Sequence, residues 1–138
     1  MDDVDQVILE SLITNARTSK ASLARKLNLT EAAVRKRLKK LEKSGIVVGY
    51  RAVLDYQKAG LVASIMGVDT QPEKLWKVIE YLKTLSEVKT ILLTSGDHMM
   101  LIEIVVKSMD MLEEVHGKIG RYDGVMRVCP AIFIKSVK

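Results

Sequence analysis

Residues 29–45 constrain this chain most, because their pattern permits only an amphipathic helix with a defined start and end. Thr30 stands where an N-cap side chain accepts an orphan amide hydrogen, and Gly45 suits the left-handed position that ends a helix. Apolar residues recur at i, i+4 and i+7, and lysines occupy the opposite side. The apolar stripe is Val34, Leu38 and Leu41, and the basic face is Lys36, Lys39, Lys40 and Lys43. One face therefore requires a core and the other suits phosphate.

Positive charge is concentrated around this helix. Residues 17–51 hold eleven Lys or Arg and two acidic residues, whereas the whole chain has a net charge of +5. A charged face on an isolated helix is usually only solvated. An excess confined to one segment, however, is typical of a nucleic-acid-binding surface. We therefore predict double-stranded DNA as a partner.

Composition limits the class of protein. A chain of 138 residues with 48% hydrophobic and 28% charged residues suits one ordinary domain or two small ones. Its apolar runs are far shorter than the roughly 20 residues that cross a bilayer, so we expect no membrane partner. The acidic N-terminus does not resemble a secretion signal. The single cysteine, Cys129, excludes an internal disulfide and fits a cytoplasmic location.

The residues before the basic helix predict two more helices. Asp2 or Asp3 can cap a first helix that ends near Asn15, and Ser19 or Ser22 can cap a short second one. A tight turn then leads into the basic helix. This is helix-turn-helix spacing, in which the second helix of the pair enters the major groove by its N-terminal half. Residues 46–54 predict a two-stranded wing, although no hairpin turn is evident.

The candidate DNA-binding residues differ in their expected roles. At the outward start of the basic helix, Arg35 is the best candidate for reading a base, and the lysines suit phosphate. Arg37 lies beside the apolar stripe and either contacts phosphate or braces the first helix. Glu42 is expected to pair with a neighbouring cation. The full set is Ser22, Arg25, Lys26, Thr30, Ala32, Arg35, Lys36, Arg37, Lys39, Lys40 and Arg51.

The second half alternates strands and helices. Strands are expected at 61–69, 88–94, 99–107 and 124–134, with helices that begin near Pro72 and after Ser108. This order is the split βαβ of the ferredoxin-like fold. The chain is therefore assigned to the α+β class. A winged helix-turn-helix domain over 1–54 is followed by a linker at 55–60 and a ferredoxin-like βαββαβ domain over 61–138.

The third strand of this domain is apolar on both faces. Met100, Ile102, Ile104 and Val106 share one parity, and Met99, Leu101 and Val105 share the other. Two helices cover only one face of the sheet, so an apolar face remains uncovered in a monomer. We predict that the sheets of two subunits pack together in a homodimer. Scattered surface apolar residues are the alternative.

The pattern resembles the Lrp/AsnC (feast/famine) transcription regulators. Residues 37–50, which read R-L-x-x-L-E-x-x-G-I-x-x-G-Y, carry most of the resemblance in the first half. The second half is similar to the effector-binding and oligomerisation domain of the same family. The resemblance covers essentially the whole chain. It implies a DNA-binding transcription regulator that is tuned by an amino acid or related small effector and forms homodimers or higher oligomers.

Members of that family bind amino acids at a Gly-Asp-Tyr-Asp-like turn between the second and third strands. Here the turn retains the glycine and the first acid, but Met99 replaces the second acid. The last strand also departs from the family, since residues 128–131 lack its hydroxyl groups. The effector-binding residues implied by the resemblance are Ser95, Gly96, Asp97, His98 and Met99, with Asp97 as the ammonium partner.

No pattern of an enzyme stands out. His98, His116 and Cys129 lack the paired spacing of a metal site, and no phosphate loop, triad or acid pair is present. We therefore expect no catalytic residue, no metal and no cofactor besides an effector. Two functions remain: a sequence-specific transcription regulator, and an architectural DNA-coating protein with little base preference.

Overall fold

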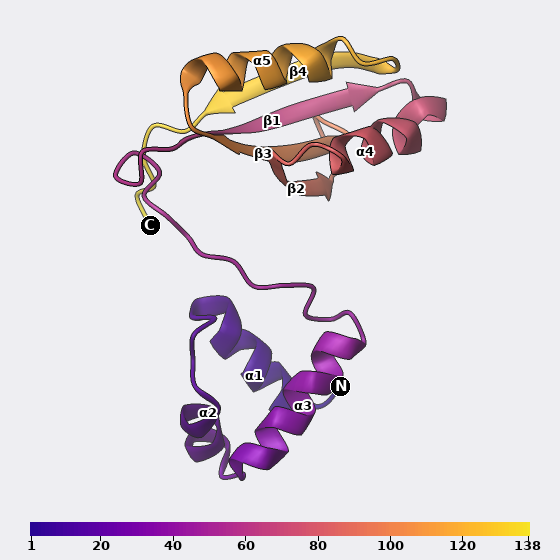
Figure 1. Ribbon diagram of the computed structural model, residues 1–138. Helices are drawn as coiled ribbons and strands as arrows, with labels where there is room; N and C mark the ends of the chain where they lie inside the picture. The colour runs from indigo at the N-terminus through magenta and orange to yellow at the C-terminus, as the bar shows by residue number, and fades with distance from the viewer. The chain divides into compact units, whose positions relative to one another are not determined.

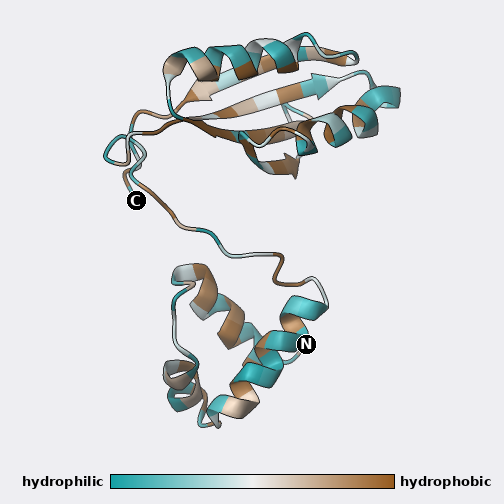
Figure 2. Cartoon of the chain, in the orientation of Figure 1, coloured by the Kyte–Doolittle hydropathy of each residue, from teal (hydrophilic) through white to brown (hydrophobic).

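In the computed structural model, which describes residues 1–138, three helices form the first of two compact units, Met1–Val53. They are α1 (Asp3–Thr14), α2 (Lys20–Leu27) and α3 (Glu31–Lys43) (Figure 1). The residue before each helix caps it, because its side chain accepts a hydrogen bond from the backbone amide three residues further along the chain. The three caps are Asp2, Ser19 and Thr30. The predicted helix-turn-helix is confirmed, with α3 mostly hydrophilic in Figure 2.

The core of this unit is small and fully apolar. It comprises Ile8, Leu23, Ala24, Val34, Leu38 and Leu41, each at most 9% exposed. The predicted stripe of α3 therefore packs against α1 and α2. Asn28 adopts the left-handed conformation between α2 and α3, at φ 55°, which turns the chain sharply enough for the two helices to pack.

The two strands predicted for residues 46–54 are not formed. Gly45 ends α3 at φ +79°, and the amides of Ile46 and Val47 both bond to the Leu41 carbonyl. Beyond that point residues 48–55 have no regular structure, with Val48 and Val53 about nine-tenths exposed. The segment lacks a two-residue turn that would reverse it, and an isolated hairpin is marginal without a third strand.

Residues 55–60 were predicted to be a linker, but in the structure they fold onto the second unit, Leu54–Lys138. The Asp55 carboxylate accepts the Lys58 amide, and the Leu61 amide donates to the Tyr56 carbonyl. The Tyr56 ring packs edge-on against Phe133 with centroids 5.4 Å apart. Burial of this aromatic pair draws the segment onto the sheet.

The second unit is ferredoxin-like, as predicted. Its elements are β1 (Val62–Thr70), the short 3₁₀ turn η1 (Pro72–Lys74), α4 (Leu75–Lys83), β2 (Val88–Leu93), β3 (Met100–Val106), α5 (Met109–Gly120) and β4 (Val125–Ile132). The sheet order is β2-β3-β1-β4, and every neighbouring pair is antiparallel. Proline opens η1 rather than α4 itself, because its fixed φ suits this tighter turn.

Helices α4 and α5 cover only one of the two faces of the sheet. Residues of the even parity on β3, including Ile102 and Ile104, are buried against α4 and α5. The other parity faces away from the helices, and Ile65 and Leu92 on that side are 39% and 53% exposed. Leu92 pairs with Leu101, which pairs with Gly67 on β1. The sheet therefore keeps an uncovered apolar face in the single chain.

Candidate DNA-binding and effector sites

The basic face of α3 is exposed and free of acidic partners. Arg35, Lys36, Lys39 and Lys40 are all exposed, and none of them forms an ion pair. The other predicted contacts outside Arg37 are exposed as well: Ser22, Arg25, Lys26, Thr30, Ala32 and Arg51. Arg35, Lys36, Lys39 and Lys40 therefore remain available to an external partner. A cluster of cations on one helix face suits a phosphate backbone.

Lys20 is a cation of this face that the sequence pattern did not single out. A shallow hollow of about 180 Å³ is lined by Lys20 from the start of α2 and by Arg35, Leu38, Lys39 and Glu42 of α3. The sequence signal that could have identified Lys20 is its position directly after the helix cap Ser19. The N-termini of α2 and α3 thus contribute to one basic surface.

Arg37 braces the first helix, which is one of the two roles left open for it. Its Nη1 lies 2.8 Å from the Asp2 carboxylate and 3.2 Å from that of Asp5. The hydrogen bond from Arg37 lowers the pKa of Asp2 to about 2. We therefore assign Arg37 to the contact between α1 and α3 rather than to phosphate.

Glu42 has a different partner from the predicted cation. Its Oε1 accepts a hydrogen bond from the Tyr50 hydroxyl at 2.8 Å. Burial raises the pKa of Tyr50, and the Glu42 contact raises it further. The ring of Tyr50 is held near the end of α3 by this bond, so it draws the start of the extended segment back onto the first unit.

The turn between β2 and β3 is held at its base and open at its tip. The Thr94 amide bonds to the Met99 carbonyl at 3.0 Å, and the Thr94 hydroxyl bonds to the His98 carbonyl at 2.7 Å. Gly96 has φ +102°, a conformation that side chains disfavour. The amides of residues 95–98 make no hydrogen bond within the chain. Ser95, Gly96 and Asp97 are exposed, and the charge of the Asp97 carboxylate is among the contacts that raise the pKa of Arg127, after the hydrogen bond to Asp69.

Asp69 anchors this turn, and sequence reasoning missed it. Its Oδ1 accepts the Met99 amide at 2.9 Å, while its Oδ2 contacts His98 Nδ1 at 3.0 Å and Arg127 Nε at 3.1 Å. Burial raises the pKa of Asp69, but the bonds from Met99, His98 and Arg127 outweigh it and hold the pKa below its ordinary value. Arg127 Nη2 also donates to the Asp97 carbonyl at 3.2 Å. Asp69 and Arg127 face each other across β1 and β4, so only the strand register reveals the pair.

His98 and Met99 fold back onto the sheet. The His98 ring lies over Gly67, where an added Cβ would lie 2.5 Å from the ring. Met99 Sδ lies 3.3 Å from the Thr70 amide. Of the five predicted effector-binding residues, the structure therefore presents Ser95, Gly96 and Asp97 to solvent, while His98 and Met99 support them from beneath.

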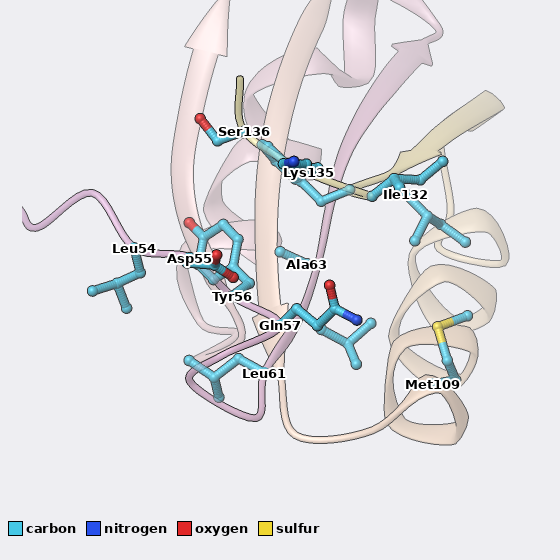
Figure 3. A pocket seen from close by; sticks show the side chains of 13 residues that line it. Leu54, Asp55, Tyr56, Gln57, Leu61, Ala63, Met109, Ile132, Lys135 and Ser136 are labelled. Carbon is cyan, nitrogen blue, oxygen red and sulfur yellow. The ribbon is translucent and has the colours of Figure 1, made fainter. Parts of the chain in front are cut away.

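A separate hollow of about 350 Å³ lies at the other end of β1. Figure 3 shows Leu54, Tyr56 and Leu61 on one side of it, with Met109 of α5 and Ile132 on the other. None of the residues predicted for DNA or effector binding lines this hollow. Its walls are mainly apolar.

The His, Cys and acidic side chains do not gather into a metal site. No group of three or more His, Cys, Asp or Glu side chains could hold a metal ion. His116 instead hydrogen-bonds through Nε2 to the buried Ser64 hydroxyl at 2.8 Å, and burial lowers the pKa of its imidazole. No helix is long and apolar enough to span a bilayer.

Comparison with protein families divides the chain in the same order as the fold. A winged helix-turn-helix DNA-binding model matches residues 1–48, and a model of the Lrp/AsnC ligand binding domain matches residues 63–138. The HTH-type transcriptional regulator LrpA of Pyrococcus horikoshii is 44% identical, over 100% of this chain and 99% of its own length. LrpA of Pyrococcus abyssi is 43% identical over the same shares.

Solved structures show the same fold. The crystal structure of PH0061 matches with a TM-score of 0.86 at 23% identity, covering 100% of this chain and 95% of that one. AsnC of E. coli matches with a TM-score of 0.71 at 26% identity and the same coverage. The complex of the regulator NMB0573 with L-Met from Neisseria meningitidis matches with a TM-score of 0.74 at 22% identity, over 100% of this chain and 92% of that chain.

Proposed function

The chain belongs to the Lrp/AsnC family of transcription regulators, and we propose that it binds DNA in a sequence-specific way as a homodimer tuned by an amino acid or related small effector. It has a DNA-binding and a ligand-binding domain and is not an enzyme. We place its activity in the cytoplasm.

The observation that carries this proposal is the unpaired basic surface of α3. Arg35 and Lys36 stand in the N-terminal half of α3, the part that enters a major groove in a helix-turn-helix, and Lys39 follows one turn later. Lys20 extends the surface onto α2. Arginine suits bidentate contact with guanine, and lysine suits phosphate. We assign base reading to Arg35 and phosphate contact to the lysines.

The uncovered sheet face supports the homodimer. Ile65 and Leu92 are exposed on it, and Leu92 pairs with Leu101 of β3 on the same face. An apolar sheet face without helices is stabilised when a second sheet packs on it. Two copies related by a two-fold axis would present two α3 helices to a pseudo-palindromic site.

The open turn supports the effector part of the proposal. Asp97 offers an exposed carboxylate for an ammonium group, and the free amides of residues 95–98 offer donors. Burying an ammonium without adequate pairing costs several kcal/mol. The turn retains one acid instead of two, so we expect weak binding of ordinary amino acids.

The alternative function is an architectural protein that coats DNA with little base preference. One experiment separates it from the regulator: affinity for a selected binding site is compared with affinity for competitor DNA at one salt concentration. A regulator should favour its site by about 10³ or more. A ratio close to one would overturn the proposed function and support the coating protein.

A further inference from the structure

Glu31 is an acidic residue within the most basic part of the chain. Residues 17–51 hold eleven Lys or Arg and only two acids, Glu31 and Glu42. Glu42 has a partner within the fold, since it accepts a hydrogen bond from the Tyr50 hydroxyl at 2.8 Å. Glu31 is exposed, and its carboxylate forms no ion pair or hydrogen bond within the chain. Its charge is therefore available to an external partner.

The position of Glu31 places it where a helix-turn-helix meets the bases. It is the first residue of α3, directly after the cap Thr30. The N-terminal residues of the second helix of such a pair contact base edges in the major groove. Ala32 follows, and Arg35 and Lys36 lie one turn later, all of them exposed. Glu31 thus belongs to the same part of α3 as the residue assigned to base reading.

A carboxylate at this position opposes binding to the DNA backbone. Two negative charges repel each other, so Glu31 lowers the affinity of α3 for phosphate whatever the base sequence. A carboxylate near a base edge can offset this repulsion only by accepting a hydrogen bond from a base. The structural alternative is that Glu31 only stabilises α3, because an acid in the first turn interacts favourably with the helix dipole.

We propose that Glu31 is a specificity-determining residue that accepts a hydrogen bond from the N4 amino group of a cytosine in the major groove. This inference rests on the proposed sequence-specific binding of DNA. An ionised carboxylate can only accept hydrogen bonds. Cytosine presents only a donor at its major-groove edge, whereas guanine presents two acceptors and thymine presents an acceptor and a methyl group. Adenine presents an acceptor beside its donor and therefore suits an amide better than a carboxylate.

The cytosine read by Glu31 should lie at a different base pair from the guanine assigned to Arg35. The two residues are four positions apart, which is about 6 Å along the helix axis. Successive bases of one strand are about 3.4 Å apart along the DNA axis. Glutamate and arginine at this spacing often form an ion pair on a helix, but here they form none. A role of Glu31 in positioning Arg35 is the second alternative.

The test is selection of binding sites from a randomised DNA library by the full chain and by Glu31→Gln. Glutamine pairs with adenine through two hydrogen bonds, so the preference at one position of each half-site should change from cytosine to adenine. Glu31→Ala should lose the preference for cytosine without gaining adenine. The matched control is Glu10→Gln, which removes the same charge from an exposed site on α1 of the same unit. The control should retain the preferences of wild type.

Fluorescence anisotropy then measures affinity for the selected site and for the same site with adenine in place of cytosine. Glu31→Gln should bind the cytosine site about tenfold more weakly than wild type and the adenine site more tightly. Affinity for DNA of scrambled sequence should rise, because the variant lacks the charge that repels phosphate. Equal weakening on all three DNAs would mean that Glu31 only supports α3, and this would overturn the proposal.

Three further outcomes would also overturn it. If wild type has base preferences and Glu31→Gln retains all of them, the proposed regulator function stands and the role of Glu31 is refuted. If Glu31→Gln alters only the position that Arg35→Ala also alters, Glu31 positions Arg35 and reads no base of its own. If wild type prefers no base at any position, the sequence-specific function itself fails and the role of Glu31 fails with it.

Discussion

The Nη1 of Arg37 lies 2.8 Å from the carboxylate of Asp2, so the ion pair joins the middle of α3 to the start of α1. Asp2 also caps α1 through the Asp5 amide. One carboxylate therefore serves the helix start and the helix interface together. The contact withdraws one arginine from the DNA-facing charge and fixes the orientation of α3 within its unit.

The pKa of Asp2 predicts a pH dependence of stability. The carboxyl has a pKa of about 2 in the fold and an ordinary value of 3.8. The charged form is therefore favoured by folding, and its stabilisation is complete above about pH 4 and lost as the pH falls through about 2. Asp2→Asn keeps an N-cap but removes the charge. Thermal unfolding measured from pH 5 to pH 2 should show a smaller pH dependence for Asp2→Asn than for wild type, while the control Asp3→Asn should match wild type.

The lysines of α3 predict a change in the salt dependence of DNA binding. Each phosphate contact releases about one counterion, so replacing Lys36 and Lys39 together by Ala should flatten the slope of log affinity against log salt by about 2. Fluorescence anisotropy over a salt series measures this slope. Replacing Lys58 and Lys107 of the second unit by Ala removes the same charge as a control. Equal slopes for the two double variants would refute the placement of the DNA surface on α3.

Arg35 predicts a change in specificity. If its guanidinium reads a guanine, Arg35→Ala should cost about 1–3 kcal/mol on the preferred site and little on a site mutated at that base. Selection from a randomised DNA library should show relaxed preference at one position of each half-site. Lys36→Ala should weaken all sites alike, and this comparison separates base reading from backbone contact.

The two faces of the sheet predict opposite outcomes for the same substitution. Ile65→Asp places a charge on the uncovered face and should give folded monomers, because the charge opposes packing of a second sheet. Ile102→Asp buries an unpaired carboxylate beneath the helices and should prevent stable folding. Sedimentation with circular dichroism measures both properties. A monomeric wild type at micromolar concentration would contradict the proposed homodimer.

Gly67 predicts a steric effect on the effector turn. A Cβ at this position would lie 2.5 Å from the His98 ring, so Gly67→Ala should displace the ring and cost about 1–3 kcal/mol of stability. Effector affinity should fall with it, because His98 supports the turn. Gly49→Ala adds the same methyl group where nothing lies within 4 Å. Urea unfolding measures the stability of the two variants. Equal stabilities would mean that the added methyl group at position 67 does not strain His98, and this would contradict the prediction.

The helices and strands could be predicted from the sequence because their signals are local. Thr30 caps α3 by bonding to the amide of Ala33, only three residues away. The buried stripe of α3 and the alternation on β3 follow from helix and strand periods in the same way. The order of elements then sufficed for the ferredoxin-like fold, because few topologies satisfy one strand-helix-strand-strand-helix-strand order.

The sequence by itself therefore determined where α3 starts and ends, which residues face a core and which segment carries the positive charge. Only the tertiary structure decided that Arg37 pairs with Asp2, that residues 46–54 form no strands and that Asp69 meets Arg127. Those two residues lie 58 positions apart in the chain and pair through Oδ2 and Nε only in the register of β1 and β4. Contacts of this kind depend on the packing of distant segments, and no local propensity or periodicity encodes which distant side chain will lie within hydrogen-bond reach.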